Sequence, residues 1–222
     1  MAEEIQNRRP LATRNKRWAQ KLAQLLTRSN ITPNQISVLS VGFAVAGFYT
    51  AFLVHTSPEV SCKITYLLLT AAMIQLRLLC NMMDGLVAVE GGKKSSTGDL
   101  FNDVPDRLAD IFLIIGIAAV EGFSSSLIHW GWLAVVAAVL TAYMRTLGAS
   151  LGLPADFGGP MAKQHRMFTL TLACLLASVE LQVYGTHMVI RYAMIIVAVG
   201  GLLTFTRRMV RAYKLLQARG MK

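Results

Sequence analysis

Six apolar stretches separated by short polar segments constrain this chain more than any other feature of its sequence. A helix needs about 20 predominantly apolar residues to cross a bilayer. The hydrophobic share of 54% and the charged share of 15% also set the chain apart from an average soluble domain. The stretches are Ile36–Val54, Ile64–Val89, Leu100–Val120, Leu127–Leu147, Met167–Tyr184 and Met188–Phe205. We therefore predict an all-α integral membrane protein with six transmembrane helices.

The segment over residues 11–28 predicts an amphipathic helix that lies on the membrane surface, because apolar side chains can share one face while basic residues occupy the rest. That face consists of Leu11, Trp18, Leu22, Leu25 and Leu26. Thr32 followed by Pro33 is typical of a helix cap with proline at the first helical position. We predict one domain over residues 1–222. It comprises a cytoplasmic surface helix within residues 1–30, a six-helix bundle over 31–212 and a basic tail over 213–222.

The net charge of +10 is unevenly distributed. Cations concentrate in both tails and in the second and fourth connections between apolar stretches, whereas the other connections contain few. An even number of spans places both tails on one side, which the positive-inside rule makes cytoplasmic. This pattern favours a membrane over nucleic acid as the partner. We expect the chain in the cytoplasmic membrane of a bacterium.

The polar stretch over residues 81–107 carries the strongest functional signal. Acidic and amide side chains at membrane-helix ends are costly to place and mark function by default. Asn81 and Asp84 are three residues apart, so they share a helix face. Asn102 and Asp106 are four residues apart and also share a face. Two helices that each present two oxygen ligands could hold hard cations beside a phosphate.

At these residues the chain resembles the CDP-alcohol phosphotransferases, whose signature runs D-x2-D-G-x2-A-R-x8-G-x3-D-x3-D. The matching positions are Asp84, Gly85, Ala88, Gly98 and Asp106. The departures are Asn81 and Asn102, which replace two aspartates, and Val89, which replaces the arginine. The resemblance implies a surface helix, six spans and an active site on the cytoplasmic side. The departures concern the chemistry more than the fold.

The resemblance also implies roles for these residues. A divalent metal, Mg²⁺ or Mn²⁺, would be bound by Asn81, Asp84, Asn102 and Asp106. Asp106 would also act as catalytic base for the acceptor hydroxyl. The CDP moiety would be bound by Asp84, Gly85, Ala88, Ser95 and Gly98. The two asparagines change the formal charge of the metal positions from −4 to −2, because an amide oxygen can ligate a cation but brings no charge.

Three explanations fit the asparagines. The site binds one metal, or two weakly until the substrate supplies phosphate charge. Alternatively, neighbouring acids compensate, because four aspartates recur at helical spacing. This stripe consists of Asp99, Asp103, Asp106 and Asp110. Finally, the protein could be an inactive relative, which the retained motif positions disfavour.

Five cations are candidates for binding the acceptor or its phosphate. Arg77 lies one turn before the motif and would either pair with an acid of the stripe or contact phosphate. Arg107 would contact the acceptor or form a salt bridge at the helix end. Arg145, Lys163 and Arg166 match positions that hold the acceptor's phosphate in branches of the family that use phosphorylated acceptors. The alternative for these three is topology alone, since cytoplasmic connections carry cations anyway.

The resemblance favours a membrane transferase of phospholipid synthesis. It would move a phosphatidyl group from CDP-diacylglycerol to a small hydroxylated acceptor and release CMP. Glycerol 3-phosphate, inositol phosphate and serine all remain open as acceptors. The alternatives are a catalytically inactive CDP-lipid-binding relative and, less favoured, a transporter, whose binding groups would lie near the bilayer midplane. A homodimer is the family expectation.

Overall fold

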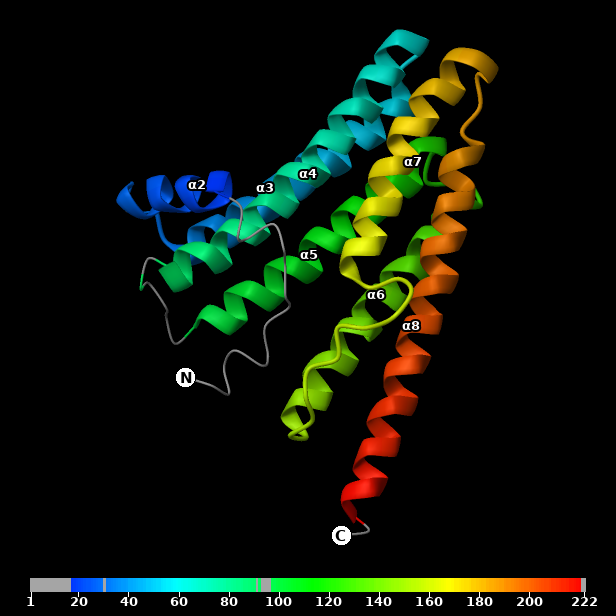
Figure 1. Ribbon diagram of the computed structural model, residues 1–222. Helices are drawn as coiled ribbons and strands as arrows, with labels where there is room; N and C mark the ends of the chain where they lie inside the picture. Colours follow the sequence, from blue (N-terminus) through cyan, green and yellow to red (C-terminus); the bar gives the residue numbers. More distant parts are fainter. Residues whose placement is uncertain (1–16, 30, 91, 93–96, 221–222) are drawn as a thin grey trace.

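The computed structural model describes residues 17–29, 31–90, 92 and 97–220, and this part of the chain contains helices but no strand (Figure 1). The helices are α2 (Arg17–Arg28), α3 (Pro33–Thr56), α4 (Val60–Glu90), α5 (Gly98–Ala118), α6 (Leu127–Ser150), α7 (Lys163–Tyr184) and α8 (Met188–Gly220). A short 3-10 helix, η2 (Ala119–Glu121), follows α5. The predicted all-α fold is confirmed.

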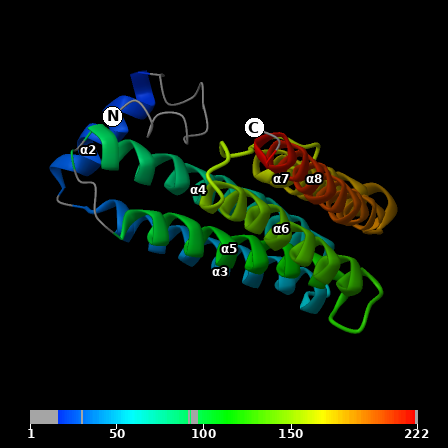
Figure 2. The same ribbon diagram turned by 90° about the horizontal axis from the view of Figure 1, so that it is seen from below.

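The long helices form a bundle of two packed groups. In the first group α3 packs against both α4 and α5, and in the second α8 packs against both α6 and α7. The contacts of α4 with α7 and of α5 with α6 join the groups. Viewed from below, α3, α4 and α5 lie along one side and α7 and α8 along the other (Figure 2). This arrangement brings the first turn of α7 toward the polar ends of α4 and α5.

Within the described residues, five helices are long and apolar enough to cross a membrane, namely α3, α4, α6, α7 and α8. The third predicted span corresponds to α5, which is long enough but keeps charged side chains through its first half. The charged residues there are Asp99, Asp103, Asp106, Arg107 and Asp110. The count of six spans therefore remains a prediction, although α5 packs within the bundle between α3 and α6.

The start of α3 has the predicted cap. The Thr32 hydroxyl accepts a hydrogen bond from the Gln35 amide at 3.3 Å, and the Thr32 amide donates to Gln35 Oε1 at 2.9 Å. Pro33 occupies the first turn, where its missing amide donor costs nothing. This reciprocal capping satisfies donors that the helix start would otherwise leave unpaired.

α3 and α5 approach each other closely at two glycines. A Cβ atom at Gly116 would lie 2.5 Å from the Cα of Phe48, so only glycine allows the observed contact. A Cβ atom at Gly47 would lie 2.6 Å from the Leu113 side chain. Two glycines on facing helices thus allow the backbones to approach closely, as is common between membrane helices.

A helix is confirmed in the described part of the predicted surface segment, Arg17–Arg28, and its place on the membrane stays a prediction. Ala19 and Ala23 are buried, and α2 packs against α4. Trp18 and Leu25 of the predicted apolar face are exposed, whereas Leu11 lies outside the described residues. Leu22 and Leu26 of that face are partly buried and pack against the same cluster as Ala19 and Ala23. α2 therefore attaches to the bundle through one part of its apolar face and leaves Trp18 and Leu25 exposed.

Candidate active site

Asp84 is buried near the end of α4 and is held by neutral donors. The Ser37 hydroxyl of α3 donates to Asp84 Oδ2 at 2.8 Å, and the Gly85 amide donates to Oδ1 at 2.6 Å. Only 5% of Asp84 is exposed. The hydroxyl and the amide fix the carboxylate without neutralising it, which leaves its charge available to a cation.

Asp106 of α5 lies at a meeting point of α4, α5 and α7. Its Oδ1 accepts from Asn81 Nδ2 at 2.8 Å and from the Arg77 guanidinium at 3.3 Å. Its Oδ2 accepts from Lys163 Nζ at 2.5 Å. The Arg107 guanidinium adds an ion pair at 3.6 Å. The predicted catalytic base is therefore buried and surrounded by three cations.

Lys163 links the two motif helices. Besides Asp106, its ammonium group donates to Asn81 Oδ1 at 2.6 Å. Asn81 thus accepts from Lys163 while its amide nitrogen donates to Asp106, which closes a triangle of three hydrogen bonds. Three residues that the sequence placed in the metal and acceptor sets are in direct contact.

Asp110 forms a second buried cluster one turn further along α5. It accepts from Arg77 at 2.8 Å and from Arg166 at 2.5 Å. All three side chains are almost completely buried. The predicted pairing of Arg77 with an acid of the stripe is confirmed, as expected for charges withdrawn from water. The Nε and Nη1 atoms of Arg77 and Arg166 are buried without a hydrogen-bond partner in the described part of the chain.

The remaining predicted positions surround this centre. Asn102 is exposed, one turn before Asp106. Gly85 and Ala88 are partly buried on α4 and Gly98 begins α5, whereas Ser95 lies outside the described residues. Arg145 of α6 forms an ion pair with Asp103, and its guanidinium lies 5.8 Å from the centre of the Phe157 ring.

These pairings bear on how the asparagines are compensated. Asp110 is shared by two arginines and Asp103 is paired with Arg145, so neither adds net negative charge to the motif positions. The side chain of Asp99 lies outside the described part of the structure. Among the described residues no group of three histidine, cysteine, aspartate or glutamate side chains could hold a metal ion.

The oxygen atoms at the motif positions are nevertheless of the kind that binds a hard cation. Within the described part of the chain, the hydrogen bonds of Asp84 include no cationic partner. Asn81 presents an amide oxygen one turn earlier on the same helix, and that oxygen accepts from Lys163. Mg²⁺ and Mn²⁺ prefer such oxygen ligands and are often bound through one or two carboxylates together with substrate phosphates. The site therefore fits a divalent ion, with less protein charge than four aspartates would supply.

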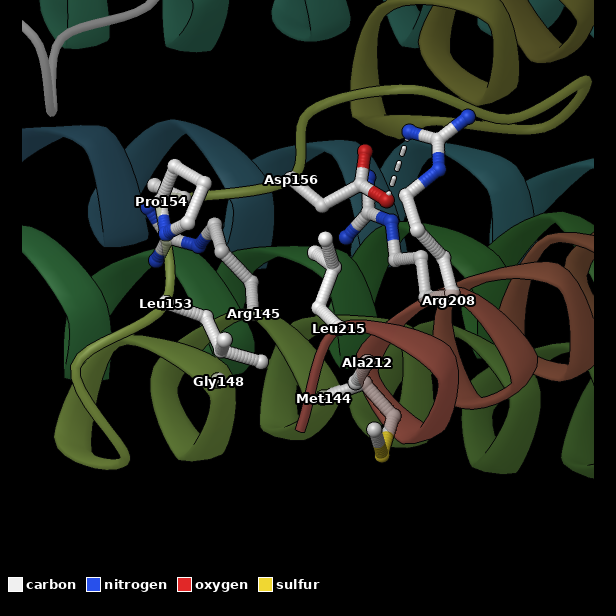
Figure 3. Close-up of a pocket in the computed structure, with 11 residues that line it drawn as sticks. Met144, Arg145, Gly148, Leu153, Pro154, Asp156, Arg208, Ala212 and Leu215 are labelled. Atoms are coloured by element: carbon white, nitrogen blue, oxygen red, sulfur yellow. Dashed lines mark hydrogen bonds and ion pairs between the residues drawn. The ribbon is translucent and has the colours of Figure 1, made fainter. Parts of the chain in front are cut away.

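A partly open pocket of about 130 Å³ lies between α6, the α6–α7 connection and α8 (Figure 3). Its polar lining consists of Arg145, Asp156, Arg208 and Arg211. Arg211 pairs with Asp156 at 2.9 Å, while Arg208 donates to the carbonyls of Gly158 and Thr141. Arg145 also pairs with Asp103 of α5, which connects the pocket to the motif helix.

Sequence reasoning missed three of these functional candidates. Ser37 lies inside an apolar stretch one helical turn after Pro33, and Arg208 and Arg211 were assigned to the charge pattern of the C-terminal end. Helical spacing was the available signal for Arg208. It lies four residues after Thr204 and seven after Gly201, both buried, so it shares their inward face.

The CDP-alcohol phosphatidyltransferase family model matches residues 30–206. The phosphatidylinositol phosphate synthase of Streptomyces avermitilis is 25% identical over 192 residues, which cover 85% of this chain and 75% of that protein. The archaetidylinositol phosphate synthase of Pyrococcus horikoshii is 22% identical over 200 residues, which cover 89% and 92% of the two chains.

Solved structures share the fold. The crystal structure of Mycobacterium tuberculosis phosphatidylinositol phosphate synthase with CDP-DAG bound has a TM-score of 0.73 at 21% identity and covers 89% of this chain and 94% of its own. The same enzyme in complex with manganese and citrate has a TM-score of 0.71 at 21% identity, covering 87% and 88%.

This chain belongs to the CDP-alcohol phosphatidyltransferase family. Membership confirms the prediction of a membrane enzyme of phospholipid synthesis that transfers a phosphatidyl group. The relatives compared above are synthases of inositol phosphate lipids, and one of them binds manganese.

Proposed function

We propose that this chain transfers the phosphatidyl group of CDP-diacylglycerol to a hydroxyl of a phosphorylated polyol, with inositol phosphate as the first candidate. The observation that carries this proposal is the Asp106 carboxylate, buried at the junction of α4, α5 and α7 and oriented by Asn81 and Arg77. The relatives support the polyol, because their products are named phosphatidylinositol phosphate and archaetidylinositol phosphate.

In the proposed reaction the acceptor oxygen forms a bond to the phosphorus that carries diacylglycerol, and the bond from that phosphorus to the CMP oxygen breaks. Asp106 accepts the proton of the acceptor hydroxyl. Asn81 and Arg77 hold the Asp106 carboxylate in place, so alignment of nucleophile and leaving group is set before reaction. Gly85 and Gly98 would allow the nucleotide to approach the backbone closely, because glycine has no Cβ atom. Ala88 and Ser95 remain part of the proposed CDP set.

Among the predicted metal positions, Asp84 would hold a divalent ion, Mg²⁺ or Mn²⁺, together with substrate phosphate. The assignment of Asn81, Asn102 and Asp106 as metal ligands stays a prediction, since Lys163 contacts the oxygens of Asn81 and Asp106. When bound, the ion would polarise a phosphate oxygen and offset charge on the departing CMP. Ser37 would orient the Asp84 carboxylate toward it.

The acceptor's phosphate would be bound on the side of α6 and α8. Arg145 lines the pocket there together with Arg208 and Arg211, and guanidinium groups suit a phosphate geometrically. Arg107 and Lys163 lie beside Asp106, close to where the acceptor hydroxyl would react. The assignment of Arg77 and Arg166 to the acceptor remains a prediction, with their unpartnered guanidinium nitrogens in its favour.

We further propose that the site and both termini face the cytoplasm of a bacterium, and that the chain forms a homodimer. The charge distribution supports the orientation. The dimer rests on family expectation.

The test is release of CMP by the purified protein in mixed micelles containing CDP-diacylglycerol and Mn²⁺. The acceptor panel comprises inositol phosphate, glycerol 3-phosphate, inositol and serine. We expect turnover with inositol phosphate and none in the matched variant Asp84→Asn. Turnover only with an unphosphorylated acceptor would overturn the acceptor assignment. Binding of CDP-diacylglycerol without turnover on any acceptor would identify an inactive relative.

A further inference from the structure

Lys163 places a cation on two oxygens predicted to ligate metal. It is the first residue of α7, which packs against α4, and its side chain reaches the gap between α4 and α5. The ammonium nitrogen is 2.6 Å from Asn81 Oδ1 and 2.5 Å from Asp106 Oδ2. A divalent ion sharing those two oxygens would need nearly the same position, because metal–oxygen distances are about 2.0–2.6 Å.

Asn81 is matched to this arrangement. Its amide donates to Asp106 and accepts from Lys163 at the same time. An ionised aspartate at this position could only accept, so it would lose the contact to Asp106 and place two like charges side by side. Asn81 is therefore a partner of Lys163 and Asp106, and its presence does not by itself indicate an inactive relative.

Among the described residues, no lysine or arginine forms a hydrogen bond to Asp84, the other carboxylate of the motif. Its partners are the Ser37 hydroxyl and the Gly85 amide. Each carboxylate oxygen has room for about two donors or one donor and a cation. The two carboxylates of the site thus differ, since Asp106 is neutralised by cations of the chain and Asp84 is not.

We propose that Lys163 is a built-in cation, and that the chain binds one divalent ion on the Asp84 side instead of two ions across the motif. This inference rests on the proposed function, and it states which positive charges offset the carboxylates of that site. The ammonium group holds Asn81 and Asp106 together and supplies the positive charge that a second metal would otherwise bring. Lys163 is thus a positioning residue as well as a neighbour of the acceptor.

The test counts Mn²⁺ bound per chain in detergent micelles, from the electron paramagnetic resonance signal of the free ion. We expect one ion per chain in the unmodified protein and in Lys163→Arg, which keeps the charge. The double variant Asn81→Asp, Lys163→Met restores a carboxylate and removes the ammonium, so it should bind two. Lys214→Met, which removes an exposed lysine of α8, should bind one.

Two ions in the unmodified protein, or one in the double variant, would overturn the proposal. If the double variant does not elute as a folded species, Lys163→Gln alone replaces it. The proposal then requires Mn²⁺ affinity to rise at least about tenfold, since a neighbouring positive charge is removed, and unchanged affinity would refute it. CMP release is measured on the same preparations. Its absence in the unmodified protein would refute the proposed function while the metal count still decides the role of Lys163.

Discussion

Two buried carboxylates of this protein are held in opposite ways. Asp84 on α4 is bound by a hydroxyl and an amide, whereas Asp110 on α5 lies between the guanidinium groups of Arg77 and Arg166. A buried carboxylate without a cation is expensive unless a ligand supplies one, while a carboxylate between two arginines is already compensated. We propose that this difference separates a carboxylate that binds a metal ion from one that holds helices together. Asp106 combines features of both, because it is paired with cations and is also the proposed catalytic base.

Among the variants that test this comparison of carboxylates, Asp106→Asn has the largest expected effect. It removes the proposed base while an amide can still contact Asn81 and Arg77. We expect CMP release to fall by about 10²–10⁴-fold, the range for loss of a general base. Binding of CDP-diacylglycerol, measured by equilibrium dialysis in micelles, should remain. Activity above a tenth of the original would show that the base lies elsewhere.

The structural side of the comparison is tested by Asp110→Asn. The change leaves two buried guanidinium groups without a carboxylate, and we expect the free energy of unfolding to fall by about 3–5 kcal/mol. Unfolding is followed by circular dichroism during titration of mixed micelles with sodium dodecyl sulfate.

Asp84→Asn is the matched control for that stability measurement. An amide at this position keeps one oxygen that can accept from the Gly85 amide, and its nitrogen can donate to the Ser37 hydroxyl, so the change in stability should stay below about 1 kcal/mol. Equal destabilisation by the two variants would remove the distinction between the carboxylates.

A smaller effect is expected from Ser37→Ala, which removes the donor that orients Asp84. Loss of a group that orients a metal ligand typically lowers metal affinity about 10–100-fold, and Mn²⁺ titration checks this value. Ser40→Ala is the matched control, because the Ser40 hydroxyl donates to a carbonyl of its own helix instead. If both variants bind Mn²⁺ like the original, Asp84 is not the metal ligand.

The smallest effect on activity and stability is expected from a substitution in the pocket beside α8. Arg211 is partly exposed, so Arg211→Ala should change stability by less than about 1 kcal/mol. If the pocket holds the acceptor's phosphate, KM for inositol phosphate should rise about tenfold, the value of one charged hydrogen bond. KM for CDP-diacylglycerol should not change. A rise in both constants would argue for general disruption of the α6–α7 connection.

Local rules were sufficient for much of the fold. The cap at Thr32 follows from residue types within four positions, and the apolar stretches located six long helices of the bundle. The last stretch was predicted to end at Phe205, but α8 continues to Gly220 because the following residues are good helix formers outside the apolar segment. The hydropathy of a segment indicates where the chain leaves the apolar part of a bilayer. A helix can continue beyond that point, so hydropathy does not predict where the helix ends.

The site was harder to predict, because its decisive contacts join distant segments. The spacing of Asn81 and Asp84 identified one helix face, and the position of Arg77 correctly indicated an acidic partner. The contact of Lys163 with Asn81 depends on α7 packing against α4, across 82 positions of sequence. The hydrogen bond from Ser37 to Asp84 likewise depends on α3 packing against α4. Helical spacing within one element carries no information about such pairings.

The most direct test of the central claim is the initial rate of CMP release as a function of free Mn²⁺, with CDP-diacylglycerol and inositol phosphate as substrates. One ion on the Asp84 side, with Lys163 as the second positive charge, predicts no turnover without metal and a hyperbolic rise that describes a single site. A sigmoidal rise, or turnover that persists after chelation of metal, would contradict the account.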